Sequence, residues 1–155
     1  MKDFRRTLND IRDSWTETDS YLASRELKAR TSGRREYWQR LRHINNQSHF
    51  LTMHASFEDY VNRTLEKCFS KQTMTGKTWT RRRAWEVLKP RKIRTMSFKK
   101  KIALLTQKGH SDYNSINDYY KTRNNIAHGQ FSDVLPLVIP DVYDDFLKVA
   151  QSFTI

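Results

Sequence analysis

The chain has 155 residues, of which 37% are apolar and 30% are charged, with four glycines and three prolines. This length suits one domain over residues 1–155 with a hydrophobic core, and the scarcity of glycine and proline favours long regular elements. The net charge of +12, from 29 basic and 17 acidic residues, favours a polyanionic partner such as nucleic acid.

The sequence gives no support for a secreted or membrane-spanning protein. Cys68 is the only cysteine, so the chain cannot form an internal disulfide. The charged residues 1–6 are not followed by the apolar stretch of a secretion signal. The longest apolar run, residues 134–139, contains Pro136 and is too short to span a bilayer. We therefore expect a cytoplasmic protein with no membrane partner.

The first half of the chain predicts long helices. Residues 3–28 carry apolar side chains at spacings of three, four and seven, as an amphipathic helix requires. Residues 31–33, Thr-Ser-Gly, indicate a break. A second helical pattern runs over about residues 34–69, and the polar stretch 45–48 leaves open whether this is one helix or two.

The middle of the chain predicts two shorter helices. Residues 70–78 are polar and contain a glycine, which indicates a loop. A helix over about 80–88 should end before Pro90, because a proline disfavours helical geometry in the residue before it. Ser97 can cap a further helix that extends through Leu105.

The last part of the chain predicts two more helices. Residues 111–127 have helical spacing, and Gly129 is well placed as the C-cap. A final helix should start at Asp141. Residues 134–139 carry the only strand pattern, and Pro136 weakens it. The expected fold is an all-α antiparallel bundle of about five to six helices.

Most of the excess charge lies in one basic segment, residues 77–101, which has eleven basic residues and one acidic residue, Glu86. Such a segment can follow the phosphates of RNA. Trp79 and Trp85 lie within this segment. Each ring either stacks on an unpaired nucleotide base or anchors its helix in the core. The predicted RNA-binding residues are Arg81, Arg82, Arg83, Arg91, Lys92, Arg94, Lys99, Lys100 and Lys101.

The segment with the clearest chemistry is Arg123-Asn124 followed, three residues later, by His128. A guanidinium can stabilise negative charge at phosphorus, and an imidazole titrates near neutrality and can move protons. On a helix, Asn124 and His128 share a face, whereas Arg123 and His128 are about 140° apart around the axis. Arg123 must therefore reach around the helix, the helix must distort near Gly129, or a second copy must complete the site.

This motif resembles the Arg-polar-x3-His signature of the HEPN (higher eukaryotes and prokaryotes nucleotide-binding) superfamily. The long preceding helix, with Phe-Glu-Asp-Tyr at residues 57–60, is similar to the arrangement in that family. The resemblance implies a small all-α bundle that cleaves RNA without a metal or cofactor. His128 would deprotonate or position the ribose 2′-hydroxyl, Arg123 would neutralise the phosphorane, and Asn124 would match the polar residue. The product would carry a 2′,3′-cyclic phosphate.

The resemblance also implies partners. Family members commonly form homodimers in which two motifs face one cleft, and many are toxins or phage-defence effectors. An antitoxin protein is therefore a candidate partner, besides RNA. Some HEPN toxins are neutralised by modification of a tyrosine two positions after the histidine, but Gln130 occupies that position here.

Alternative roles remain for these residues. Arg123 could instead form a salt bridge with Asp118 or Glu58, and His128 could simply cap helix carbonyls. Glu58 or Asp59 is a candidate to orient Arg123. The histidines lack metal-ligand spacing, so no metal site is expected. The competing hypotheses for the whole chain are a non-catalytic HEPN-like module, binding nucleic acid or a partner, and a basic helical DNA-binding regulator.

Overall fold

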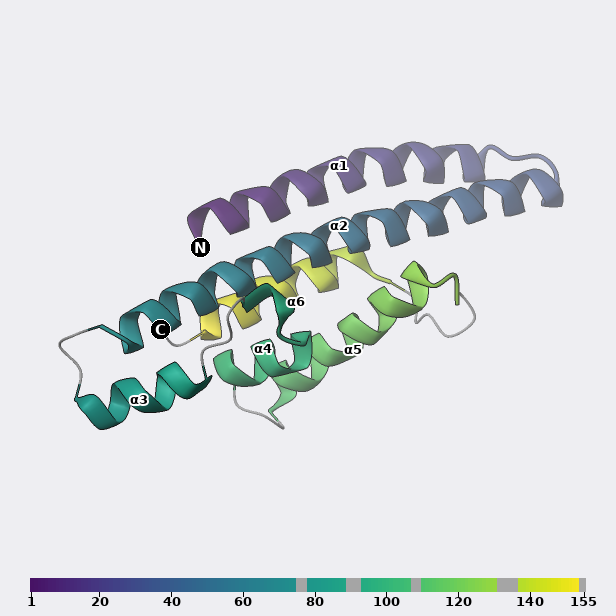
Figure 1. The fold of residues 1–155 in the computed structure, drawn as a ribbon. Coiled ribbons are helices and arrows are strands. Elements are labelled where there is room, and N and C mark those ends of the chain that lie inside the picture. Colours follow the sequence, from purple (N-terminus) through teal and green to yellow (C-terminus); the bar gives the residue numbers. More distant parts are fainter. Residues whose placement is uncertain (75–77, 89–92, 107–109, 131–136, 154–155) are drawn as a thin grey trace.

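The computed structural model describes residues 1–74, 78–88, 93–106, 110–130 and 137–153. Over these residues the chain is helical and contains no strand (Figure 1). None of the described helices is long and apolar enough to cross a membrane. The expected all-α class is confirmed. The elements are α1 (Lys2–Leu27), α2 (Ser32–Gln72), α3 (Trp79–Leu88), the 3-10 helix η1 (Ile93–Thr95), α4 (Phe98–Leu105), α5 (Ser111–Ala127) and α6 (Ile139–Ser152).

The second helical pattern is one continuous helix, α2, of 41 residues. Its polar stretch does not break the helix, and Asn46 within that stretch bonds to neighbouring elements while the buried Nδ2 of Asn45 has no hydrogen-bond partner among the described residues. Asn46 Oδ1 accepts from Trp15 Nε1 of α1 at 2.8 Å. Asn46 Nδ2 donates to the carbonyl of Leu137, just before α6, at 3.3 Å. Gln47 Nε2 lies 2.8 Å from the Nε2 atom of His43. The polar stretch thus joins α2 to its neighbours.

The core lies along the apolar face of α2, which every other element contacts. Its buried residues recur every three or four positions, as expected for one face of a helix. The rings of Phe57 and Phe146 of α6 stack at 4.6 Å. In Figure 1, α1 runs antiparallel to α2 on one side, and α4 and α5 lie on the other. The buried residues of this face are Phe50, Met53, Phe57, Val61, Leu65 and Phe69.

The chain departs from the sequence expectations around α6. The helix begins at Ile139, two residues before Asp141, with Pro140 in its first turn. A proline suits this place because its fixed φ matches a helix and its missing N–H would be unpaired there anyway. The strand pattern is therefore wrong at Ile139, while residues 134–136 lie outside the described part of the chain. The short helix η1 was not anticipated from the sequence.

Gly129 ends α5 as the sequence predicts. Its φ of 71° lies in the left-handed region. The N–H of Gly129 donates to Ile126 at 3.1 Å, and the N–H of Gln130 donates to Asn125 at 2.8 Å. This pair of hydrogen bonds is a Schellman motif, which satisfies carbonyls that the last helical turn would leave unpaired. The residue before the glycine, His128, is thereby turned out of the helix at a defined place.

Gly129→Ala should lower the free energy of unfolding by about 1–2 kcal/mol, because an added Cβ disfavours the left-handed backbone. Apart from its chain neighbours, no atom of the described residues lies within 4 Å of that Cβ, so we expect the effect to be conformational. Gly33→Ala is the matched control, since Gly33 lies in the first turn of α2 and also has open space. That change should stabilise by a few tenths to about 1 kcal/mol. Urea unfolding measures both, and equal effects of the two substitutions would contradict the prediction.

Candidate functional site

The predicted catalytic residues lie at the C-terminal end of α5. This helix packs against α2, α4 and α6, and its Ile116 and Ile126 are buried in the shared core. His128 is the C-cap residue and is exposed to solvent. Arg123 and Asn124 lie more than one turn back and are half-buried. One short stretch of helix therefore holds a guanidinium, an amide and an exposed imidazole.

Arg123 is not neutralised by a carboxylate among the described residues. Its Nη1 donates to Asn124 Oδ1 at 3.0 Å. The carboxylates considered as salt-bridge partners lie with other cations. Asp118 Oδ1 is 2.8 Å from Lys121 Nζ, and Glu58 Oε1 is 3.8 Å from Lys101 Nζ. The Arg123 charge consequently remains available to an anion.

Among the described residues, no hydrogen bond links the side chains of Arg123 and His128. Asn124 and His128 share a helix face, as helix geometry predicts, but the side-chain oxygen of Asn124 accepts a hydrogen bond from Arg123. The hydrogen bond between Asn124 and His128 is the backbone one, from the His128 N–H to the Asn124 carbonyl at 3.0 Å. The helix also remains regular up to Ala127. Of the three alternatives set by helix geometry, a distorted helix end is thus not observed, whereas a reach of the Arg123 side chain around the helix and completion by a second copy both stay open.

A buried histidine, His54 of α2, faces this region. Its side chain is only 1% exposed and lies among the rings of Phe50, Phe98, Tyr120 and Phe146, at centroid distances of 5.3–6.1 Å. Neither ring nitrogen has a hydrogen-bond partner among the described residues. Burial, with a smaller contribution from the positive charge of Arg123, lowers the pKa of His54 to about 4. His54 is therefore neutral at neutral pH.

Sequence reasoning did not connect His54 with the motif. Its spacing from Phe50 and Phe57 places it on the apolar face of α2, so the sequence pattern is enough to predict that it is buried. The pattern does not predict its proximity to Arg123, because the two residues are on different helices. How close His54 lies to Arg123 depends on how α5 packs against α2.

Glu58 and Asp59 do not orient Arg123 in this structure. Glu58 faces Lys101, and Asp59 pairs with Arg63 one turn further along α2. Asp59 also accepts a hydrogen bond from Arg94 Nη2 at 3.3 Å. Both carboxylates therefore hold cations of α2, η1 and α4, and the orienting contact of Arg123 comes from Asn124.

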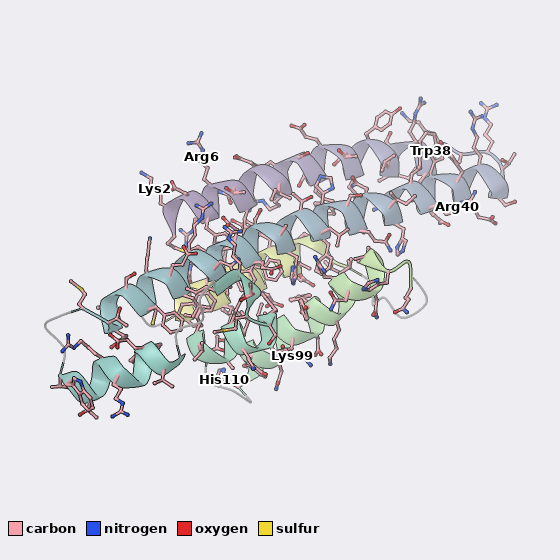
Figure 2. The ribbon with its side chains drawn as sticks, in the orientation of Figure 1. Lys2, Arg6, Trp38, Arg40, Lys99 and His110 are labelled. Carbon is pink, nitrogen blue, oxygen red and sulfur yellow. The ribbon has the colours of Figure 1, made fainter. Side chains whose placement is uncertain are left out.

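The basic segment divides into exposed and buried members. Lys99, labelled in Figure 2, and Lys100 are exposed on α4, and Arg83 is exposed on α3. Lys101 is only 2% exposed, and its Nζ lies 3.4 Å from the Arg94 carbonyl. An ammonium in this position cannot follow RNA at the surface, so Lys101 does not belong to the RNA-binding set. Arg82 is half-buried and Arg94 is exposed, while the Arg81 side chain, Arg91 and Lys92 lie outside the described residues.

The two tryptophans of this segment have different surroundings. Trp85 packs edge-on against Phe69 of α2, with centroids 5.3 Å apart, and so anchors α3. Trp79 is 63% exposed, and the Arg83 guanidinium lies 4.9 Å from its ring centroid. The sequence left two interpretations for these tryptophans. Trp85 fits the core anchor, and Trp79 fits the exposed ring on which a base can stack.

No protein-family model, curated protein or solved structure matches this chain. The likeness to HEPN proteins therefore depends on residues 123–128 and on the helical character of the chain. The function has to be argued from the geometry of the site.

Lowering the pH from 7 to 5 should destabilise the protein partly through His54. The folded pKa of about 4 lies below the ordinary value of 6.5, so the unfolded chain binds a proton first as the pH falls. The stability that depends on a neutral His54 is present above pH 6.5 and is lost as the pH falls toward 4. This single group should contribute about 2 kcal/mol of the loss between pH 7 and 5.

Urea unfolding of the wild type and of His54→Phe at the two pH values measures this contribution. The variant should lose about 2 kcal/mol less than the wild type over the same interval. The same pH dependence in the wild type and His54→Phe would rule out His54 as the titrating group.

Proposed function

We propose that this protein is a metal-independent endoribonuclease of the HEPN type. The observation that carries the proposal is an exposed imidazole at the end of α5 together with a guanidinium that has no carboxylate partner among the described residues. RNA cleavage of this kind needs one group that moves a proton and one that stabilises charge on phosphorus. His128 and Arg123 supply these two groups.

The proposed reaction is a transesterification within the RNA. The ribose 2′-oxygen attacks phosphorus as His128 removes its proton, and the bond from phosphorus to the 5′-oxygen breaks. The products are a 2′,3′-cyclic phosphate and a 5′-hydroxyl, which takes a proton from solvent or from a second imidazole. Arg123 neutralises the charge that develops on the phosphoryl oxygens. Asn124 holds the Arg123 guanidinium through the 3.0 Å hydrogen bond.

The site works in this proposal as a homodimer. Within one chain, Arg123 is engaged by Asn124 and the His128 ring makes no hydrogen bond to a described residue. A twofold arrangement of two α5 ends would let Arg123 of one copy act with His128 of the other. The exposed position of His128 beyond the last helical turn leaves it accessible to such a partner.

The RNA backbone lies over the exposed basic residues of α3, η1 and α4 in this proposal. Arg83, Lys99 and Lys100 would contact phosphates, and Trp79 offers a face on which a base can stack. Such contacts do not specify sequence. The protein would act in the cytoplasm as a toxin or phage-defence effector, with an antitoxin protein as a further partner.

A second candidate is a non-catalytic HEPN-like module that binds nucleic acid or a partner. The observation that favours it is the same engagement of Arg123 by Asn124, which directs the guanidinium to its neighbour and not to His128. A module of this kind would retain the basic surface without needing the two groups to meet.

Purified protein should cleave single-stranded RNA in the presence of EDTA, because the proposed chemistry uses no metal. His128→Ala and Arg123→Ala should each lower the cleavage rate by at least about 100-fold. His110→Ala is the matched control for an exposed histidine and should cleave normally. Arg123→Lys keeps the charge but loses the planar fork and should restore only part of the rate. Gel analysis gives the rates, and anisotropy gives the binding of the inactive variants.

The test separates the two candidates. Binding by the wild type without cleavage, over several unrelated RNAs, would support the non-catalytic module. Cleavage that survives both substitutions would place the chemistry elsewhere.

Mixing Arg123→Ala with His128→Ala after unfolding and refolding should restore about a quarter of the wild-type activity. Half of the dimers formed are mixed, and a site shared between copies is intact once in each of them. If each site used Arg123 and His128 of the same chain, no mixed dimer would contain an intact site. The absence of recovery from a mixture that forms dimers would therefore exclude the shared site.

A further inference from the structure

The connection between α1 and α2 forms a basic pocket. The pocket has a volume of about 390 Å³ and is lined by Arg25, Lys28, Arg30, Arg34 and Trp38, among others. Among the described residues that line it, none is acidic. It lies where the α1–α2 hairpin projects beyond the other helices, near Trp38 and Arg40 in Figure 2. We refer to it as the tip pocket.

The cations of the tip pocket are not paired with carboxylates of the described residues. The contrast is Arg42, further along the same hairpin, which is held by Asp19 at 2.9 Å and by Glu26 at 3.0 Å. Glu26 also accepts a hydrogen bond from Gln39. The carboxylate nearest in sequence to Arg25 is thus already engaged, and the pocket keeps its positive charge.

The helix dipoles account for the positions of two of these basic residues but not for the positions of the other two. Arg25 and Lys28 lie at the C-terminal end of α1, where a positive side chain is favoured. Arg30 and Arg34 lie at the N-terminal end of α2, where the helix dipole disfavours a positive side chain. The first turn of α2 also has no acidic residue to offset them. Helix stability therefore does not account for Arg30 and Arg34, whereas an anionic ligand would be attracted by both the side chains and the helix end.

One wall of the pocket is held in place by aromatic rings. The Arg25 guanidinium lies 5.5 Å from the ring centroid of Tyr21 and 5.7 Å from that of Trp38. Its Nε also donates to the Tyr21 hydroxyl at 3.2 Å. A guanidinium fixed in this way loses less side-chain freedom when it binds an anion.

We propose that the tip pocket binds phosphates of an RNA strand, as a second contact separate from the Arg123–His128 site. This inference rests on the proposed RNA ligand but not on cleavage. In Figure 1 the C-terminal end of α5, which carries His128, lies toward the hairpin end of the bundle. A strand that starts at the tip pocket and follows α2 therefore runs toward that site. Trp85 of α3 contacts Phe69, near the far end of α2, so the two basic surfaces lie at opposite ends of that helix.

The test measures binding of a labelled 20-nucleotide single-stranded RNA by anisotropy, with the His128→Ala change in every protein to prevent cleavage. The tip variant carries Arg30→Gln and Arg34→Gln. Arg34 contributes its backbone N–H, not its side chain, to the Thr31 cap, so the fold should be preserved. The control carries Arg5→Gln and Arg6→Gln, which remove the same charge from the other end of α1, near the labelled Arg6 in Figure 2.

The tip variant should bind about tenfold more weakly at 100 mM salt, and its slope of log affinity against log salt should be smaller by about 1.4, for two lost phosphate contacts. The control should change affinity less than twofold, and both variants should melt no lower than the parent. Equal losses in the tip variant and the control would overturn the tip pocket while leaving RNA binding intact. A parent that binds no RNA would refute both this inference and the proposed function. RNA-independent binding to phosphatidylserine vesicles that requires Arg30 and Arg34 would assign the pocket to a membrane surface instead.

Discussion

The apolar face of α2 is the surface on which every other helix of the protein packs. Its 41 residues form one helix, and Asn46 in the polar stretch at its middle bonds to α1 and to the chain before α6. Burial of aromatic rings along this face, such as the stack of Phe57 on Phe146, supplies the main driving force. The positions of α4 and α5, and hence of the candidate site, follow from that packing.

The candidate site combines a rigid support with an exposed reactive group. The core beneath α5 contains His54, whose ring is kept neutral by burial and by the nearby charge of Arg123. At the surface, the Schellman turn at Gly129 fixes where the chain leaves the helix and turns His128 toward solvent. Arg123 lies between these two environments. In the proposed function, His128 at the surface would carry the proton and Arg123 behind it would supply the fixed positive charge.

The distribution of charge changes when ion pairs are taken into account. The basic segment 77–101 stands out in the sequence because it has a single acidic residue, yet its Lys101 is buried beside Glu58. The hairpin tip is less conspicuous, since acidic residues are interspersed with its basic ones. In the structure Arg42 engages Asp19 and Glu26, and the remaining cations gather around the tip pocket. Unpaired charge, not total charge, therefore marks the surfaces suited to a polyanion.

The sequence alone determined the all-α class, the approximate extent of the helices and the glycine that ends α5. These features depend on side-chain periodicity and on hydrogen bonds between residues a few positions apart, so a short stretch of chain contains the necessary information. It also singled out Arg123, Asn124 and His128 by their chemistry. Only the tertiary structure decided that the charge of Arg123 acts on the buried His54, that Lys101 is buried and that α2 is continuous. Each of these outcomes depends on residues from different helices meeting in the core, and the combined burial of many side chains selects that arrangement.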